Sequence, residues 1–349
     1  MTESAQRVRT VSDHPVAGDQ DLDLTVRQHK RQDSAYVVGQ TRSYDYVVRS
    51  GLAGGLAGCA AKSIIAPLDR VKILFQTASP EFKQYTGTRM GVWGAANKIY
   101  KQDGLLGLFQ GHSATLLRIF PYAAIKFVMY EQIRSVLISR PEQETNIRRV
   151  LSGSFAGVCS VFCTYPLELI RVRLAYETRQ DHRASFLKIC RQIYSEGSGG
   201  LHNFYRGFSP TVLGMLPYAG VSFWTHDTVH DLFRSPYLAP YAVTTGEVGS
   251  DRRVPLTVWA QLTAGGFAGM VAQTASYPLE VIRRRMQIGG AKNRKTVKFD
   301  SIMTTAYEIW GERGIRGYFV GLTIGYIKVI PMVSCSFLVY ERMKHMLGI

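Results

Sequence analysis

The sequence predicts an all-α membrane protein with six transmembrane helices, built from three similar units of two helices each. A charged motif occurs three times, 99 and 112 residues apart, and apolar stretches surround each copy. Hydrophobic residues make up 46% of the chain and charged residues 19%, with 33 glycines, a composition typical of closely packed membrane helices. Mean hydropathy is only -0.04. Polar groups must therefore be enclosed among the helices, where they commonly mark a solute path.

The repeated motif has the form P-x-[DE]-x-x-[KR] and occurs at Pro67–Lys72, Pro166–Arg171 and Pro278–Arg283. A proline kinks a membrane helix, and neighbouring helices can satisfy the carbonyl that it frees. Three kinked helices can converge on one point. The acid and the base of each copy are three residues apart, which places both on one helix face.

Each unit is predicted to contain a long helix, a short surface helix and a second long helix. The long helices are expected at 44–77, 111–139, 147–176, 207–233, 256–288 and 321–347. Each exceeds the roughly 20 residues that cross the hydrocarbon core. Surface helices are expected at 91–101 and 301–310, and the intervening segments end at Asp103-Gly104, Glu196-Gly197 and Arg313-Gly314.

Glycines four residues apart predict close contacts between the long helices. These pairs are Gly51 with Gly55, Gly54 with Gly58, Gly153 with Gly157, and Gly265 with Gly269. We divide the chain into a disordered polar tail at 1–43, repeats at 44–140, 147–234 and 256–349, and an insertion at 235–255. The tail contains six acidic residues and no apolar run, which argues against a transit peptide or a secretion signal.

The net charge of +16 is concentrated in three segments, 70–110, 171–206 and 283–316, which together carry +14. The connections 131–149 and 227–255 sum to zero. Basic loops that alternate with neutral ones follow the positive-inside rule for six spans. We therefore expect the three basic loops on one side of the membrane and both termini on the opposite side.

The motif charges are expected to pair between helices, because an unpaired charge at membrane depth costs about 2.5–3.5 kcal/mol. Such a ring would close the end of a central cavity that lies on the side of the basic loops. In the alternative, each pair bridges only within its own helix. The ring would consist of Asp69, Lys72, Glu168, Arg171, Glu280 and Arg283.

A second charged ring is expected at the opposite end of the helices, with the pattern acid-x-x-base. Its pairs are Glu131 with Arg134, Asp227 with His230, and Glu341 with Lys344. His230 is only partly charged near neutral pH, so this closure should be the weaker one. Two opposed rings that cannot both close around a solute describe an alternating-access device.

Four further basic residues lie in the apolar spans with no acid near them in sequence: Lys62, Arg118, Lys126 and Lys328. Snorkelling to the interface is one explanation, but Lys62, Arg118 and Lys328 lie well inside their spans. The favoured interpretation is a positive lumen that binds a phosphate-bearing solute.

Other functional classes receive little support from the sequence. Five cysteines form no CxxC pair, so we expect no metal site, and we expect no cofactor. A membrane enzyme would need a nucleophile with a base or a metal set, and only His226 and His230 have ligand spacing. A nucleic-acid-binding protein would be soluble, which six spans forbid.

The triplicated motif, its acid-x-x-base companion and the glycine-rich first helices resemble the mitochondrial carrier family over residues 44–347. The resemblance implies a pseudo-threefold six-helix barrel in the mitochondrial inner membrane, and a monomer that contacts the lipid bilayer, cardiolipin included. The basic loops and short surface helices would then lie on the matrix side, and both termini on the intermembrane-space side. It also implies glutamine braces at Gln76 and Gln287, whereas the second repeat has Ala175 at that position. The family members are transporters and not enzymes, and a peroxisomal relative stays open.

Within this family, Gly214 and Met215 occupy the position where nucleotide carriers have a glycine and an aliphatic residue against adenine. Lys62 and Arg118 match phosphate-binding positions, and Lys328 lies beside Val329, which replaces a frequent arginine. The whole chain is similar to a fungal branch associated with coenzyme A. The resemblance thus implies coenzyme A or adenosine 3',5'-diphosphate as solute, with ADP or ATP as the alternative.

Overall fold

The computed structural model describes residues 44–88, 90–138, 145–178, 185–197, 200–243, 256–292 and 301–348. The predicted tail at 1–43 and residues 244–255 of the predicted insertion lie outside the described residues. Within these ranges the chain is helical with one isolated β-bridge and no strand, so the all-α prediction is confirmed. The long helices are α2 (Tyr44–Gln76), α4 (His112–Leu137), α5 (Asn146–Tyr176), α7 (Phe208–Phe233), α9 (Val258–Lys292) and α12 (Val329–Met346).

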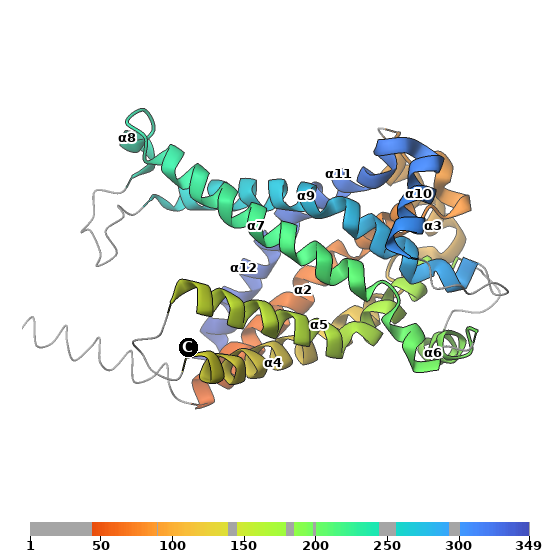
Figure 1. Ribbon diagram of the computed structural model, residues 1–349, viewed down its shortest axis with the longest axis horizontal. Coiled ribbons are helices and arrows are strands. Elements are labelled where there is room, and N and C mark those ends of the chain that lie inside the picture. Colours follow the sequence, from red (N-terminus) through yellow and green to blue (C-terminus); the bar gives the residue numbers. More distant parts are fainter. Residues whose placement is uncertain are drawn as a thin grey trace, which may run out of the picture.

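Shorter helices connect the long ones. Figure 1 shows α3, α6 and α10 gathered at one end of the molecule, while α8 and the C-terminus lie toward the other. We call the first of these the motif end, because the repeated charged motifs lie in the halves of α2, α5 and α9 that point toward it. The short helices are α3 (Gly91–Leu108), α6 (Phe186–Tyr194), α8 (Ala239–Ala242), α10 (Ile302–Arg313) and α11 (Leu322–Ile327), with 3-10 turns η1 (Pro80–Tyr85), η3 (Gly200–Tyr205) and η4 (Gly314–Phe319).

The last predicted span, 321–347, was expected to be one helix, but the structure divides it into two. It consists of α11 and α12, which meet at Lys328. Pro331 explains the break, because a proline ring clashes with the carbonyl four residues earlier, here that of Ile327. The break places Lys328 at a junction between two helical segments rather than in the middle of one.

The long helices pack mainly in neighbouring pairs: α4 with α5, α7 with α9, and α12 with α2. Helices α2, α5 and α9 also contact one another. Their buried stripes, spaced by four residues, consist of small alanine, serine and threonine side chains, which let helix axes approach closely. These stripes are Ala53, Ala57 and Ala61 on α2, Ser152, Ala156, Ser160 and Thr164 on α5, and Ala260, Ala264, Ala268 and Ala272 on α9.

The prediction that the glycine pairs form the close contacts is correct only for Gly55 and Gly58. A Cβ added at Gly55 would meet Phe120 of α4, and one at Gly58 would lie 3.7 Å from Ile119. The physical reason is the helix face: the alanine and serine stripes take the buried face, and the remaining glycines point away from it. A Cβ would meet no atom within 4 Å at Gly51, Gly54, Gly153, Gly157, Gly265 and Gly269.

The outer surface of the long helices is strongly apolar. Exposed fractions reach 78% at Val136, 70% at Leu216 and 75% at Ile330. An exposed apolar surface of this extent marks a site of contact with a membrane or with another protein. Three described stretches are long and apolar enough to cross a bilayer, namely Val48–Gln76, Arg148–Tyr176 and Ile302–Leu347.

A glycine that packs against the motif end of the next repeat precedes α4, α7 and α11. Gly111, Gly207 and Gly321 have φ angles of 84°, 79° and 83°, a left-handed conformation that side chains with a Cβ disfavour. A Cβ on Gly207 would lie 3.1 Å from the Arg283 carbonyl oxygen and 3.1 Å from the Tyr165 hydroxyl. These glycines therefore allow the repeats to approach closely.

We predict that Gly207→Ala lowers the free energy of unfolding by about 1–3 kcal/mol, because it combines an unfavourable φ with backbone crowding. Thermal unfolding in detergent, followed with a thiol-reactive dye, measures the change. Gly220→Ala is the matched control on the same helix, since no atom lies within 4 Å of its added Cβ. Equal melting temperatures for both variants would contradict this account of the packing.

Candidate functional site

A cavity of about 330 Å³ lies among the long helices next to the motif end. Its lining includes seven basic side chains and three carboxylates, so four positive charges are uncompensated within it. The charged residues are Lys62, Asp69, Lys72, Arg118, Arg171, Glu168, Glu280, Arg283, Arg284 and Lys328, and the others are Ile73, Gln76, Tyr122, Val161, Thr211 and Met215.

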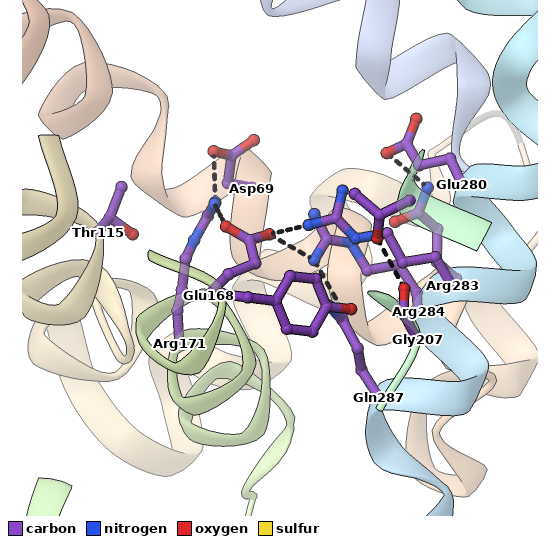
Figure 2. Close-up of polar contacts among 12 residues, drawn as sticks. Asp69, Thr115, Glu168, Arg171, Gly207, Glu280, Arg283, Arg284 and Gln287 are labelled. Atoms are coloured by element: carbon purple, nitrogen blue, oxygen red, sulfur yellow. Dashed lines mark hydrogen bonds and ion pairs between the residues drawn. The ribbon is translucent and has the colours of Figure 1, made fainter. Parts of the chain in front are cut away.

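The six predicted ring residues all line this cavity. Figure 2 shows five of them together, namely Asp69, Glu168, Arg171, Glu280 and Arg283. Arg171 of α5 donates to Asp69 of α2 at 3.1 Å. The three shortest ion pairs among the six ring residues each join two different helices. The reason is that α2, α5 and α9 converge there with their acids and bases on facing sides. The other two pairs are Lys72 Nζ to Glu280 Oε1 at 2.9 Å and Arg283 to Glu168 Oε1 at 3.1 Å.

The alternative of bridges within one helix fits only one contact of the ring. Arg171 lies 3.8 Å from Glu168 three residues earlier, farther than its 3.1 Å contact with Asp69. Pairing between helices therefore dominates, and the ring links α2, α5 and α9.

Glu168 is the most heavily paired acid of the ring. It is 2% exposed, and its carboxylate contacts Arg118 of α4 as well as Arg283 and Arg284 of α9. The Arg284 contact measures 2.8 Å. Sequence reasoning missed Arg284, although the run of three arginines at 283–285 directly after the motif was a visible signal.

The four basic residues predicted for the lumen have different surroundings. Lys328 donates to Asp69 at 2.9 Å, and Arg118 contacts Glu168, so these two cations meet acids that come from other helices. Lys62 lines the cavity, and its Nζ lies 3.6 Å from the Met332 sulfur. Lys126 is exposed on α4 and does not belong to the cavity lining.

The two residues predicted to contact adenine, Gly214 and Met215, also have different surroundings. Met215 of α7 lines the cavity. Gly214 faces the neighbouring helix, since a Cβ there would lie 3.6 Å from Leu279 of α9. The glycine thus lets α7 and α9 approach, while the methionine contributes the apolar surface.

The two predicted glutamine braces bind different partners. Gln76 donates to Glu280 at 3.2 Å and to the Tyr277 hydroxyl at 3.1 Å. Gln287 donates to the Tyr165 hydroxyl at 3.0 Å and accepts from Arg284 at 2.9 Å. Both tyrosines directly precede a motif proline, a repeated position that sequence reasoning did not use.

The predicted outer ring is far less enclosed than the ring at the motif end. Glu131, Asp227 and Glu341 are exposed. Asp227 Oδ1 lies 3.9 Å from His226 Nδ1, and the ring centroids of His226 and His230 are 4.0 Å apart, with the rings tilted by 32°. The remaining members, Arg134 of α4 and Lys344 of α12, are half-buried.

Buried arginines add a further layer of contacts at the motif end. Arg173 of α5 donates to both oxygens of Glu196, at 2.7 and 3.1 Å, and to the carbonyl oxygen of Gln287 at 2.5 Å. Arg206 also contacts Glu196 at 3.1 Å. Arg173 therefore ties α5 to its own surface segment and to α9 of the next repeat.

Arg285 occupies the equivalent position in the third repeat, seven residues after the motif proline. It pairs with Glu312 of α10 at 2.8 Å and donates to the carbonyl oxygen of Gln76 at 3.3 Å. The same two kinds of contact thus link α9 with α10 and with α2.

In the first repeat, an arginine at a different motif position makes these contacts. Position 74 is a buried leucine, and Arg70, one helical turn earlier on the same face, takes the place of the missing base. Arg70 lies 3.4 Å from Asp103 and donates to the Ala175 carbonyl oxygen at 3.4 Å. Together the three arginines connect each repeat to the next around the motif end.

The described residues contain no group of three His, Cys, Asp or Glu side chains that could hold a metal ion. The arrangement instead favours binding of an anion, because cationic side chains outnumber carboxylates in the cavity lining. Guanidinium groups suit phosphate particularly well, since they can donate two parallel hydrogen bonds.

The chain matches the family described as mitochondrial carrier protein three times, over residues 43–141, 142–237 and 254–349. It is 56% identical over 331 residues to the mitochondrial carrier protein LEU5 of Saccharomyces cerevisiae, covering 88% of this chain and 92% of that protein. It is 40% identical to human solute carrier family 25 member 16, covering 86% and 88%. The mitochondrial coenzyme A transporter SLC25A42 of Xenopus laevis is 37% identical, covering 86% of each chain.

We predict that Arg173→Ala lowers the free energy of unfolding by about 3 kcal/mol, because it breaks a buried ion pair. Arg285→Ala should lower it by less than about 1 kcal/mol, since the Glu312 partner is one third exposed. Thermal unfolding of both variants in the same detergent provides the comparison. An equal or larger loss for Arg285→Ala would overturn the assignment of Arg173 as a buried tie.

Proposed function

Because this chain belongs to the mitochondrial carrier family, we propose that it moves coenzyme A, or adenosine 3',5'-diphosphate, across the mitochondrial inner membrane. Family members are multi-pass proteins of that membrane and transport small anionic solutes, so the chain is a transporter and not an enzyme. The coenzyme A assignment is supported by the SLC25A42 relative, whose name states that solute.

The observation that carries the proposal is the positive cavity above a ring of ion pairs. A phosphate-bearing solute would supply the negative charge that the cavity lacks, because charge-assisted hydrogen bonds to guanidinium and ammonium groups are strong. Lys62, Arg118 and Lys328 are the proposed phosphate contacts, and Met215 is proposed to contact the adenine. Gly214 would keep α7 against α9, and Lys126 would attract the solute on its way in.

Transport is proposed to proceed by alternating access. The ring at the motif end is paired in this structure and would close the cavity on the matrix side. Gln76 and Gln287 would brace it. Release to the matrix would require this ring to open while the outer ring pairs, and His230 would make that outer closure weaker.

The finer architecture belongs to the same proposal. We infer that the six long helices form a pseudo-threefold barrel of repeats 44–140, 147–234 and 256–349, with α3, α6 and α10 on the matrix surface. Both termini would then face the intermembrane space. The protein is proposed to act as a monomer in contact with cardiolipin.

A carrier for ADP or ATP is the alternative, because the same cations would bind any adenine nucleotide. Purified protein in liposomes should take up labelled coenzyme A or adenosine 3',5'-diphosphate. Rapid exchange of ADP and ATP, with no uptake of coenzyme A or adenosine 3',5'-diphosphate, would contradict the proposal and favour the alternative.

We predict that Lys62→Ala raises the KM for coenzyme A by roughly tenfold, because it removes one charged contact to phosphate. Lys62 has no carboxylate within ion-pair distance in the described structure, so its loss leaves no acid unpaired. Uptake into liposomes at varied solute concentration measures the effect. Lys101→Ala, which changes an exposed lysine on α3, is the control. An unchanged KM in Lys62→Ala would remove this residue from the site.

A further inference from the structure

The positive charge of the cavity is distributed unequally over the three corners of the ring. Each corner is defined by one acid, Asp69, Glu168 or Glu280. At the Glu280 corner, one base, Lys72, lies at 2.9 Å, and the neutral Gln76 donates at 3.2 Å. That corner is balanced and has no surplus charge for a ligand.

The Asp69 corner has a surplus. Its carboxylate binds Arg171 at 3.1 Å through one oxygen and Lys328 at 2.9 Å through the other. Lys62 lines the same cavity, with only the Met332 sulfur within hydrogen-bonding distance of its Nζ among the described atoms. Two cations that share one acid, with a third close by, leave room for an anionic ligand.

The Glu168 corner has a surplus of the same size. One buried carboxylate is shared by Arg118, Arg283 and Arg284, so two positive charges remain. Figure 2 shows Arg283 and Arg284 beside Glu168. Arg284 is 9% exposed, and it lines the cavity. Among the described residues, the buried Nε atoms of Arg283 and Arg284 have no hydrogen-bond partner. A ligand that enters the cavity could accept hydrogen bonds from these two donors.

We propose that the Asp69 and Glu168 corners are two separate phosphate subsites, so that the carrier selects nucleotides phosphorylated at two positions. This inference rests on the proposed function and deepens it. Coenzyme A and adenosine 3',5'-diphosphate both carry phosphate on the 3' and the 5' oxygens of the ribose, whereas ADP and dephospho-coenzyme A carry it only on the 5' side.

The 3'-phosphate is assigned to the Glu168 corner. Met215, the proposed adenine contact, lies on α7, which packs against α9, the helix that carries Arg283 and Arg284. The 3'-phosphate is attached directly to the ribose and stays close to the adenine. The 5'-phosphates, from which the rest of coenzyme A extends, then lie toward Lys62 and Lys328. Arg284 becomes the specificity-determining residue.

The test compares Arg284→Gln with the adjacent Arg285→Gln, whose side chain pairs with Glu312 away from the cavity. Inhibition of labelled coenzyme A uptake into liposomes gives the ratio of the inhibition constants of dephospho-coenzyme A and coenzyme A. We expect a ratio of roughly tenfold or more in the wild type and in Arg285→Gln. In Arg284→Gln the ratio should fall toward one. Arg284→Lys, which keeps the charge but loses the planar donor pair, should give an intermediate ratio.

A folded Arg284→Gln with the wild-type ratio would overturn the inference, as would a wild-type ratio near one. If Arg284→Gln does not fold, an unchanged ratio in Arg284→Lys has the same meaning. Absence of coenzyme A uptake by the wild type contradicts the proposed function instead. In that case the two-phosphate inference is tested by the shift in melting temperature on adding a nucleotide. Adenosine 3',5'-diphosphate should raise the melting temperature more than adenosine 5'-monophosphate does. Equal shifts would overturn the inference.

Discussion

The buried carboxylate of Glu168 is the constraint on which the motif end depends. A carboxylate that is 2% exposed is tolerated only when cations surround it, because leaving it unpaired costs several kcal/mol. Its arginine partners come from three helices, α4, α5 and α9. These helices must therefore converge while the acid stays ionised, and a bound phosphate can compete for the same arginines. One interaction thus connects closure of the ring with occupancy of the cavity.

Most of the helices could be predicted from the sequence, because the three motif copies and the long apolar stretches are local patterns. The predicted bounds of α5 and the start of α2 agree with the structure within one residue. The role of the glycines was harder to predict, because a helix has several faces. Gly153 and Gly157 have the spacing of a contact, but the buried stripe consists of Ser152 and its neighbours on the next face.

The site residues could be predicted where a charged residue recurs at the same motif position in all three repeats. They could not be predicted where one repeat departs from that pattern. The ring residues stand at equivalent motif positions, so pairing between helices could be anticipated. Arg284 has no basic counterpart in the other repeats, where Ile73 and Val172 occupy its position. Arg70 replaces a base that is expected one turn later, at Leu74. Contacts such as these depend on distances between helices, which sequence spacing does not contain.

In the proposed mechanism, the cationic cavity opens to one side of the membrane at a time. Met215→Cys, in a background without the five native cysteines, places a single thiol in the cavity lining. A charged, membrane-impermeant thiol reagent can then be added to either face of oriented liposomes. The account predicts labelling only from the face opposite the motif end without solute, and from both faces during exchange. Labelling from both faces without solute, or from neither during exchange, would contradict it.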